Sequence, residues 1–151
     1  MNLNYRQITD IDEARSLAKD LQPIAEDMLS ELRDVEVSEE QLIARINASF
    51  ESPECLLVVV DNDEGRVGYA LTLPFEDPLT AERVPMLVLL GVSHTVRNRG
   101  IARGLVQTTL NLLAQRGIQA LAARAAHNDD ALISMGERWG FVRGWEWMIR
   151  E

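Results

Sequence analysis

The chain has 151 residues, of which 46% are hydrophobic and 26% charged, and 24 acidic against 15 basic side chains give a net charge of −9. This composition is typical of a folded globular protein, and the length fits one domain over residues 1–151. The negative field disfavours nucleic acid as a partner. The N-terminal residues lack a signal-peptide pattern, and no apolar run reaches the roughly 20 residues of a membrane-spanning helix, so a cytoplasmic protein without a membrane partner is expected.

The first third of the chain predicts a short strand followed by helices. Residues 5–8 alternate apolar and polar side chains as an edge strand does, and Thr9 is placed to cap the helix that follows. Apolar residues then recur at helical spacing, and Pro23 interrupts the series, which predicts two helices or a bent pair. Ser38 opens a further capping box, so another helix is expected to start there and to end before Pro53.

The middle third predicts strands. A β-branched run at 55–60 and a second apolar run at 67–73 flank turn-forming residues, which indicates a hairpin. The segment 74–85 is polar, acidic and bracketed by prolines, and is expected to form a surface loop. Residues 86–92 are apolar without alternation, which is typical of a buried central strand.

The last third alternates helices and strands. A helix is expected from 101 to 117, where a glycine follows its last turn, and a strand over 118–126. Asn128 is placed to cap a last helix that Gly140 would end, and residues 141–149 alternate as a final strand. The order of elements, without repeats or linkers, predicts one mixed α/β layer domain.

The turn between the central strand and the next helix is the most informative segment. Its residues 93–100 lead into a helix start, where backbone N–H groups lack intrahelical partners and bind anions. Gly100 permits close approach of a phosphate, Ala102 leaves room beside it, and positive charge comes from Arg97, Arg99 and Arg103. A pyrophosphate fits this turn, although such a turn also packs many helices against sheets, so both interpretations stay open. The glycine-rich loops typical of ATP and NAD sites are absent.

The same residues carry a family resemblance. Arg97-x-x-Gly100-x-Ala102 resembles the Q/R-x-x-G-x-G/A signature of the GNAT superfamily of N-acetyltransferases at all three fixed positions, and Gly140-Phe141 stands in the family's order. The resemblance implies a mixed, mostly antiparallel central sheet, with helices on both faces and splayed central strands. It also implies acetyl-CoA as co-substrate and no metal.

The resemblance further implies how acetyl-CoA is held. The central strand would splay from its neighbour after Leu90 to Val92 and pair there with the pantetheine arm, and the pyrophosphate would sit on residues 97–103. The implied cofactor-binding residues are Leu90, Val92, Arg97, Asn98, Arg99, Gly100, Ile101, Ala102, Arg103 and Asn128. For Asn128, contact with the cofactor and helix capping explain the residue equally well.

The implied reaction is direct transfer of an acetyl group to a primary amine of a small molecule or protein, and the acidity of the chain favours a cationic amine. A backbone N–H near Val92 would stabilise the oxyanion. The family's usual tyrosine acid is missing, because its position holds Gly136 or, counted from the preceding asparagine, Met135. Ser134 and Glu76 are weak candidates for acid and base, and water is an alternative acid, so the catalytic residues stay unassigned.

The only cysteine, Cys55, opens an apolar strand and is expected to be buried and dispensable. A rival interpretation from another class is a GNAT-like module that binds acyl-CoA without efficient catalysis, as a sensor or a partner-binding subunit. The missing tyrosine supports that rival. A monomer and a homodimer are both compatible with the sequence, and no motif identifies the acceptor.

Overall fold

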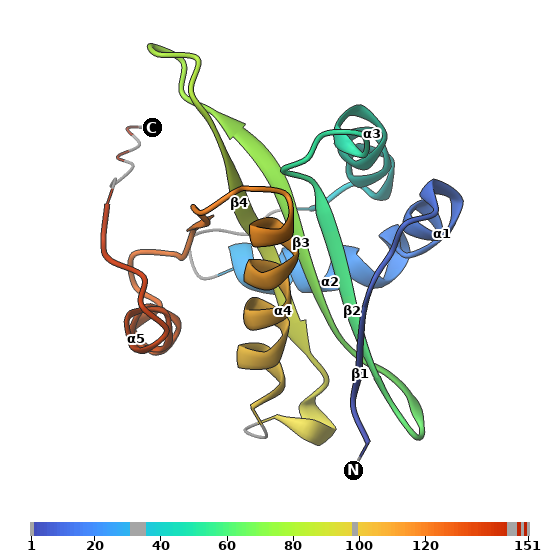
Figure 1. The fold of residues 1–151 in the computed structure, drawn as a ribbon. Coiled ribbons are helices and arrows are strands. Elements are labelled where there is room, and N and C mark those ends of the chain that lie inside the picture. The colour runs from blue at the N-terminus through green and yellow to red at the C-terminus, as the bar shows by residue number, and fades with distance from the viewer. Residues whose placement is uncertain (1, 31–35, 98–99, 145–147, 149, 151) are drawn as a thin grey trace.

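The computed structural model describes residues 2–30, 36–97, 100–144, 148 and 150. Its centre is a five-stranded sheet in the order β1-β2-β3-β4-β5, antiparallel except for the parallel pair β4 and β5 (Figure 1). The strands are β1 Asn4–Gln7, β2 Leu56–Asn62, β3 Gly65–Glu76, β4 Arg83–Val92 and β5 Ala122–Ala123. The helices are α1 Ile11–Ser16, α2 Ala18–Leu29, α3 Glu39–Ser49, α4 Ile101–Gln115 and α5 Asp130–Arg138, with a short 3-10 helix, η1, at His94–Val96.

Two hydrophobic cores lie on opposite faces of this sheet, because β2 sends alternate side chains to each. Leu57 and Val59 pack against α1, α2 and α3, whereas Val58 and Val60 pack against α4. Figure 1 shows α4 in front of the sheet with α1 and α2 behind it. The predicted fold class, a mixed and mostly antiparallel sheet with helices on both faces, is confirmed.

The N-terminal helices differ in detail from the prediction. The cap of α1 is Asp10 and not Thr9, since the Asp10 carboxylate accepts the Asp12 N–H. Two helices form as predicted, but they divide at Leu17, and Pro23 lies inside α2. The missing proline N–H removes one helical hydrogen bond, and the continuous buried face of α2 outweighs that loss. The Ser38 cap of α3 is confirmed, because its hydroxyl accepts the Gln41 N–H.

The hairpin of β3 and β4 is longer than the sequence predicts. The predicted loop 74–85 is wrong over most of its length, because both strands continue until Glu76 pairs with Arg83. Pro74 lies directly opposite Pro85 in this ladder. Two opposed prolines fit at a pair that exchanges no hydrogen bonds, so neither proline ends its strand. The hairpin therefore projects beyond the body of the domain (Figure 1).

A β-bulge interrupts the β3–β4 ladder. The register passes from Leu71 opposite Leu89 to Thr72 opposite Leu87, which leaves Val88 without an opposing residue. An extra residue of this kind bends its strand and increases the local twist. On the other edge of β4 the parallel ladder with β5 also stops at Leu87. Beyond Leu87 no described residue of β5 pairs with β4, whereas the sequence analysis places the separation of β4 from its neighbour after Leu90.

The C-terminal elements confirm the helix ends and correct the strands. Gly117 and Gly140 both adopt positive φ after α4 and α5, and the following N–H groups close the two helices as predicted. The α5 cap is Asp129, whose carboxylate accepts the Leu132 N–H, and not Asn128. Of the strand predicted over 118–126, a ladder forms only at β5, because β4 bends away. The last predicted strand lies partly outside the described residues, Trp145 and Trp147 included, and residues 141–144 are not strand.

Thr72 and Thr109 are both fully buried, so the same substitution at the two positions compares a hydroxyl without a hydrogen-bond partner with one that has a partner. The Thr109 hydroxyl donates to the Leu105 carbonyl at 2.8 Å, whereas the Thr72 hydroxyl has no partner among the described residues. Thr72→Val is therefore expected to raise the free energy of unfolding by about 1 kcal/mol, and Thr109→Val to lower it by a similar amount. Urea unfolding with an unchanged slope measures both; destabilisation by Thr72→Val would contradict the assignment.

Candidate functional site

The turn that leads from β4 into α4 is open and electropositive. Gly100 precedes α4 with φ 74° and ψ 11°, a left-handed conformation that favours glycine, and an added Cβ would meet no atom of the described residues within 4 Å. The first helical hydrogen bond runs from the Gly104 N–H to the Gly100 carbonyl, so the N–H groups of 101–103 are not used within the helix. Buried Ile101 anchors the helix start.

Charge at this helix start also favours an anion. The first turns of α1, α2, α3 and α5 all carry acidic residues, but the first turn of α4 carries none. In a chain of net charge −9, the positive end of the α4 dipole is thus not neutralised by the chain's own carboxylates in that turn. Arg97 is exposed and its Nε donates to the Val92 carbonyl at 3.3 Å. Asn98 and Arg99 lie outside the described residues.

A groove between α4 and α5 continues from this turn. It is lined by Arg103, Val106, Gln107, Leu110, Arg138 and Trp139. Arg103 belongs to both the first turn of α4 and the groove. The sequence interpretation misses Gln107, Arg138 and Trp139 as site residues. Only the helical spacing of Arg103 and Gln107, four residues apart on one face, could have indicated part of it.

The edge of β4 beside the turn is the other part of the site. From Val88 to Val92 no described strand pairs with the edge of β4 that faces away from β3. Leu90 and Val92 are half-buried, and their side chains pack against the α4 core. Backbone donors and acceptors on such an edge pair readily with an extended ligand. The open edge and the open turn adjoin, because β4 leads directly into η1 and the turn.

The comparisons identify the family. Residues 18–141 match the family described as Acetyltransferase (GNAT) family. The chain belongs to the GNAT acetyltransferase family. Among curated protein sequences, none matches this chain significantly.

Solved structures of acetyltransferases share the fold at low identity. An aminoglycoside N-acetyltransferase, AAC(6')-Iy, in complex with CoA has a TM-score of 0.71 and 16% identity, over 99% of this chain and 94% of that chain. A predicted acetyltransferase from Clostridium acetobutylicum with acetyl-CoA has a TM-score of 0.75 and 17% identity, over 99% and 96%. A glucosamine-6-phosphate N-acetyltransferase from Arabidopsis thaliana has a TM-score of 0.63 and 12% identity, over 100% and 99%.

The position of the missing GNAT tyrosine lies on the inner side of α5. Gly136 and Met135 are both half-buried, and among the described residues outside its own helix backbone a Cβ added at Gly136 would meet only the Phe141 Cβ, at 3.9 Å. A larger side chain therefore has room to start there. Ser134 instead is exposed, on the side of α5 that also carries exposed Glu137 and Arg138.

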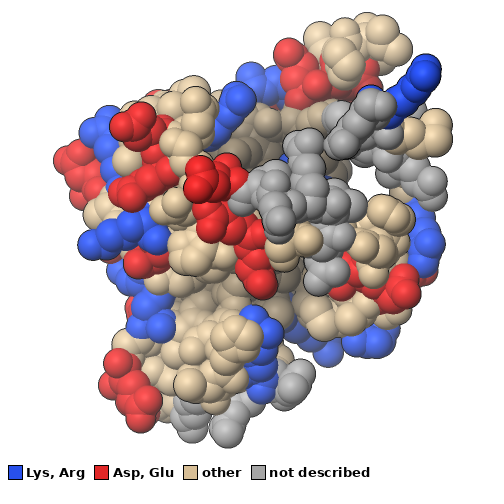
Figure 2. Space-filling view, turned by 180° about the vertical axis from the view of Figure 1, so that it is seen from behind, with Lys and Arg blue, Asp and Glu red and all other residues tan. Residues whose placement is uncertain are grey.

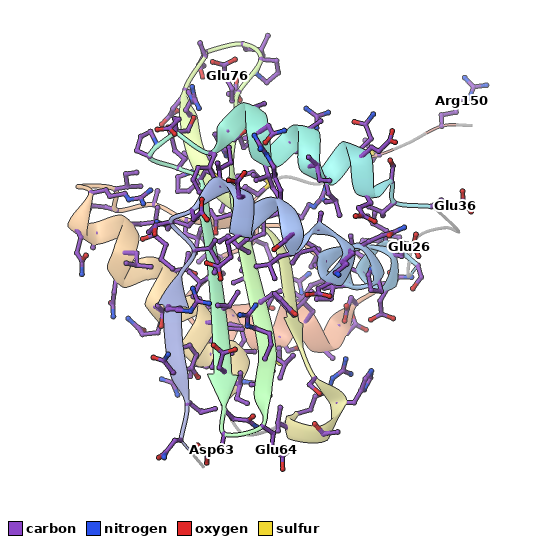
Figure 3. The ribbon with its side chains drawn as sticks, turned by 90° about the vertical axis from the view of Figure 1, so that its right-hand side faces the viewer. Glu26, Glu36, Asp63, Glu64, Glu76 and Arg150 are labelled. Carbon is purple, nitrogen blue, oxygen red and sulfur yellow. The ribbon has the colours of Figure 1, made fainter. Side chains whose placement is uncertain are left out.

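Glu76 and Asn128 lie apart from the turn. Figure 3 shows Glu76 at the hairpin, at the opposite end of the sheet from Asp63 and Glu64 in the β2–β3 turn, and the end of β4 pairs near that turn. The strand rise puts the hairpin end of β4 roughly 17 Å from the bulge at Val88. Glu76 thus does not reach the bulge directly. Asn128 is exposed in the loop before α5.

The face formed by α1, α2 and α3 is acidic. Figure 2, which views the molecule from behind Figure 1, shows Asp and Glu side chains on this face with Lys and Arg side chains among them. The acidic residues of α2 and α3 are Asp20, Glu26, Asp27, Glu39 and Glu40. One oxygen of Glu26 accepts the Val37 N–H at 3.0 Å and so fixes the chain that enters α3. The negative charge of the acidic side chains on α2 and α3 attracts cations to this face.

Cys55 is buried, as the sequence predicts. Burial raises the pKa of the Cys55 thiol to about 11, so the thiol stays protonated at neutral pH and is a poor nucleophile. Cys55→Ala is expected to keep turnover within about twofold of wild type, since the thiolate is the reactive form. Steady-state kinetics measures this, with iodoacetamide labelling of the folded protein as a second reading. Loss of turnover in a folded variant that still binds CoA would show that the thiol takes part in the reaction.

The described residues contain neither a cluster of metal-ligand side chains nor a membrane-spanning helix. No three His, Cys, Asp or Glu side chains among them gather where they could hold a metal ion. In the same part of the chain, no helix has the length and hydrophobicity needed to cross a membrane.

Proposed function

We propose that this GNAT acetyltransferase transfers the acetyl group of acetyl-CoA directly to a primary amine. One observation carries the proposal: two groups of backbone N–H donors without a helix or strand partner among the described residues lie next to each other. They are the first turn of α4 after Gly100 and the edge of β4 from Val88 to Val92. A ligand that fits both has an anionic end and an extended, amide-bearing arm. Pyrophosphate and pantetheine give CoA these two parts.

The proposed binding mode follows from this order. The pyrophosphate is held by the N–H groups of 101–103, with positive charge from Arg97, Arg99 and Arg103 around it and Asn98 as a polar contact. The pantetheine arm extends along β4 past Val92 and Leu90 toward the bulge. The nucleotide end lies toward the α4–α5 groove, where Arg138 and Trp139 supply a charge and an aromatic surface. Asn128 stays a proposed contact of the thioester end.

The proposed reaction is a single displacement. The cationic amine first loses one proton to water, and its neutral nitrogen forms a bond to the thioester carbon. The carbon–sulfur bond breaks, the nitrogen releases a second proton and the sulfur gains one. A backbone N–H on the open edge of β4 stabilises the oxyanion. Water protonates the thiolate, a step that needs only a weak acid because an ordinary thiol has a pKa of roughly 8.5. Because the buried Cys55 thiol is protonated, it is a poor nucleophile, and the proposed reaction has no acetyl-enzyme intermediate on Cys55.

The acceptor is proposed to be a cationic amine of a small molecule or protein. The net charge of −9 and the acidic face of α2 and α3 favour a cation. Relatives of the same fold are named for three acceptor kinds, aminoglycosides, glucosamine 6-phosphate and a ribosomal protein alanine. A cytoplasmic single domain, as a monomer or homodimer, stays a prediction.

The test mixes the protein with acetyl-CoA and one amine at a time, and follows free thiol. The panel holds an aminoglycoside, an amino sugar phosphate and a peptide with an N-terminal alanine. Thiol release that depends on the amine is the expected result. The rival, a GNAT module that binds acyl-CoA without catalysis, is favoured by the glycine at position 136. Tight CoA binding with no amine-dependent release from any acceptor would support the rival and contradict acetyl transfer.

A further inference from the structure

Gly104 lies in the interior of α4, where glycine is unfavourable by about 1 kcal/mol relative to alanine. A Cβ added there would overlap the Tyr5 hydroxyl, and would lie 2.5 Å from the Tyr5 Cζ and 2.9 Å from its Cε1. The end of the Tyr5 ring therefore occupies the space that a side chain at position 104 would need. Glycine at this position serves the close approach of the two elements.

A second glycine brings the same part of α4 close to the sheet. Gly68 on β3 lies beneath the helix, and a Cβ there would come within 3.1 Å of the Leu105 Cδ1 and 2.9 Å of the Val60 Cγ1. Leu105 is fully buried, and Tyr5 packs against the same core from β1. The start of α4 is thus seated on the sheet at two neighbouring points, Tyr5 into Gly104 and Leu105 over Gly68.

The contacts of Tyr5 with Gly104 and of Leu105 with Gly68 lie next to the backbone N–H groups that we assign to the pyrophosphate. The N–H groups of 101–103 precede Gly104 in the same helical turn, and the Gly104 N–H closes that turn on Gly100. A helix moves as a unit over one turn, so a displacement at Gly104 displaces these donors relative to the edge of β4. CoA must engage the turn and that edge together.

We propose that Tyr5 is a positioning residue for acetyl-CoA: its ring, seated against Gly104, sets the distance between the first turn of α4 and the open edge of β4. This inference rests on the proposed function. Tyr5 contacts no reacting atom in this scheme. Its loss or displacement therefore weakens the binding of CoA and leaves the chemical step nearly unchanged.

The test is a double-mutant cycle in the full chain. Gly104→Ala is expected to raise the KM for acetyl-CoA and the Kd for CoA about tenfold, with kcat within twofold and the KM for the amine unchanged. Tyr5→Leu in the same chain empties the space that the new methyl group needs, and is expected to restore most of the affinity. Gly144→Ala, where an added Cβ meets none of the described residues within 4 Å, is the matched control and should change neither constant.

Each outcome has one meaning. Circular dichroism first establishes that each variant folds, and should Gly104→Ala fail to fold, Tyr5→Leu alone carries the test with an expected severalfold rise in the Kd for CoA. A folded Gly104→Ala variant with the wild-type Kd would overturn the positioning role, as would a double variant no better than Gly104→Ala. Failure of the wild-type protein to bind CoA in the same titration would instead contradict the proposed function, and the positioning role with it.

Discussion

Gly100→Glu is expected to weaken CoA binding at least about a hundredfold, or ~2.7 kcal/mol, without unfolding the protein. The new carboxylate would occupy the position before the first turn of α4, where a phosphate is proposed to bind. Size and like charge both oppose the phosphate there. The fold should tolerate the change because position 100 is exposed and open, so the expected loss of stability is the strain of positive φ, about 1 kcal/mol.

Isothermal titration calorimetry with CoA measures the change in Kd. Two further variants separate the contributions of side-chain size, charge and backbone conformation. Gly100→Gln has the size of glutamate without its charge, and is expected to bind CoA more tightly than Gly100→Glu. Gly100→Asn tolerates the left-handed conformation and is expected to lose the least affinity. A folded Gly100→Glu variant with wild-type affinity would show that the pyrophosphate binds elsewhere.

Gly136→Tyr is expected to raise kcat about a hundredfold, in the range of a well-placed general acid. In the GNAT resemblance this position holds the tyrosine that protonates the departing thiolate, and here the side chain is missing. The described residues leave room for one, since apart from the helix's own backbone a Cβ added at Gly136 would have only the Phe141 Cβ among them within 4 Å. A phenol with an ordinary pKa of about 10 is protonated at neutral pH, so the gain should be full near neutrality and disappear above pH ~10.

Gly136→Phe is the matched control, because it adds the same ring without the hydroxyl. It is expected to keep the wild-type kcat or lower it. Met135→Tyr tests the other count of the family spacing. Equal kcat values for Gly136→Tyr and Gly136→Phe would contradict the role of this position in proton donation.

Local chemistry explains what the sequence predicted correctly. The turn at Gly100 and the helix ends at Gly117 and Gly140 require positive φ, a property that glycine supplies within one residue. The Ser38 cap is likewise decided by a hydroxyl and an N–H three residues apart. Such features need no information from the rest of the chain.

Pairing between distant segments explains the errors. Composition at Pro74 and Pro85 favours a loop, but the β3–β4 register opposes the two prolines at a position where neither N–H is needed. The bulge at Val88 has no signature in an apolar run, because it appears only when the two registers on either side are compared. The shortness of β5 depends on the same bend of β4, so the sequence could not predict it either.

The candidate site divides in the same way. The turn residues are consecutive, so the sequence indicates them, whereas Arg138 and Trp139 join Arg103 only because α5 packs beside α4. The role proposed for Tyr5 depends on a contact between residues almost a hundred positions apart. Glu76 illustrates the converse, since its chemistry suits a base but its place at the hairpin separates it from the bulge.

Amide chemical shifts recorded by NMR during a titration with CoA test the central claim most directly, because they locate the ligand on the chain. The account predicts that the largest shifts fall on two adjoining segments, residues 100–104 at the start of α4 and residues 88–92 on the open edge of β4, and that the hairpin around Glu76 is unaffected. Saturable shifts confined to other elements, or none at CoA concentrations that saturate related GNAT acetyltransferases, would contradict it.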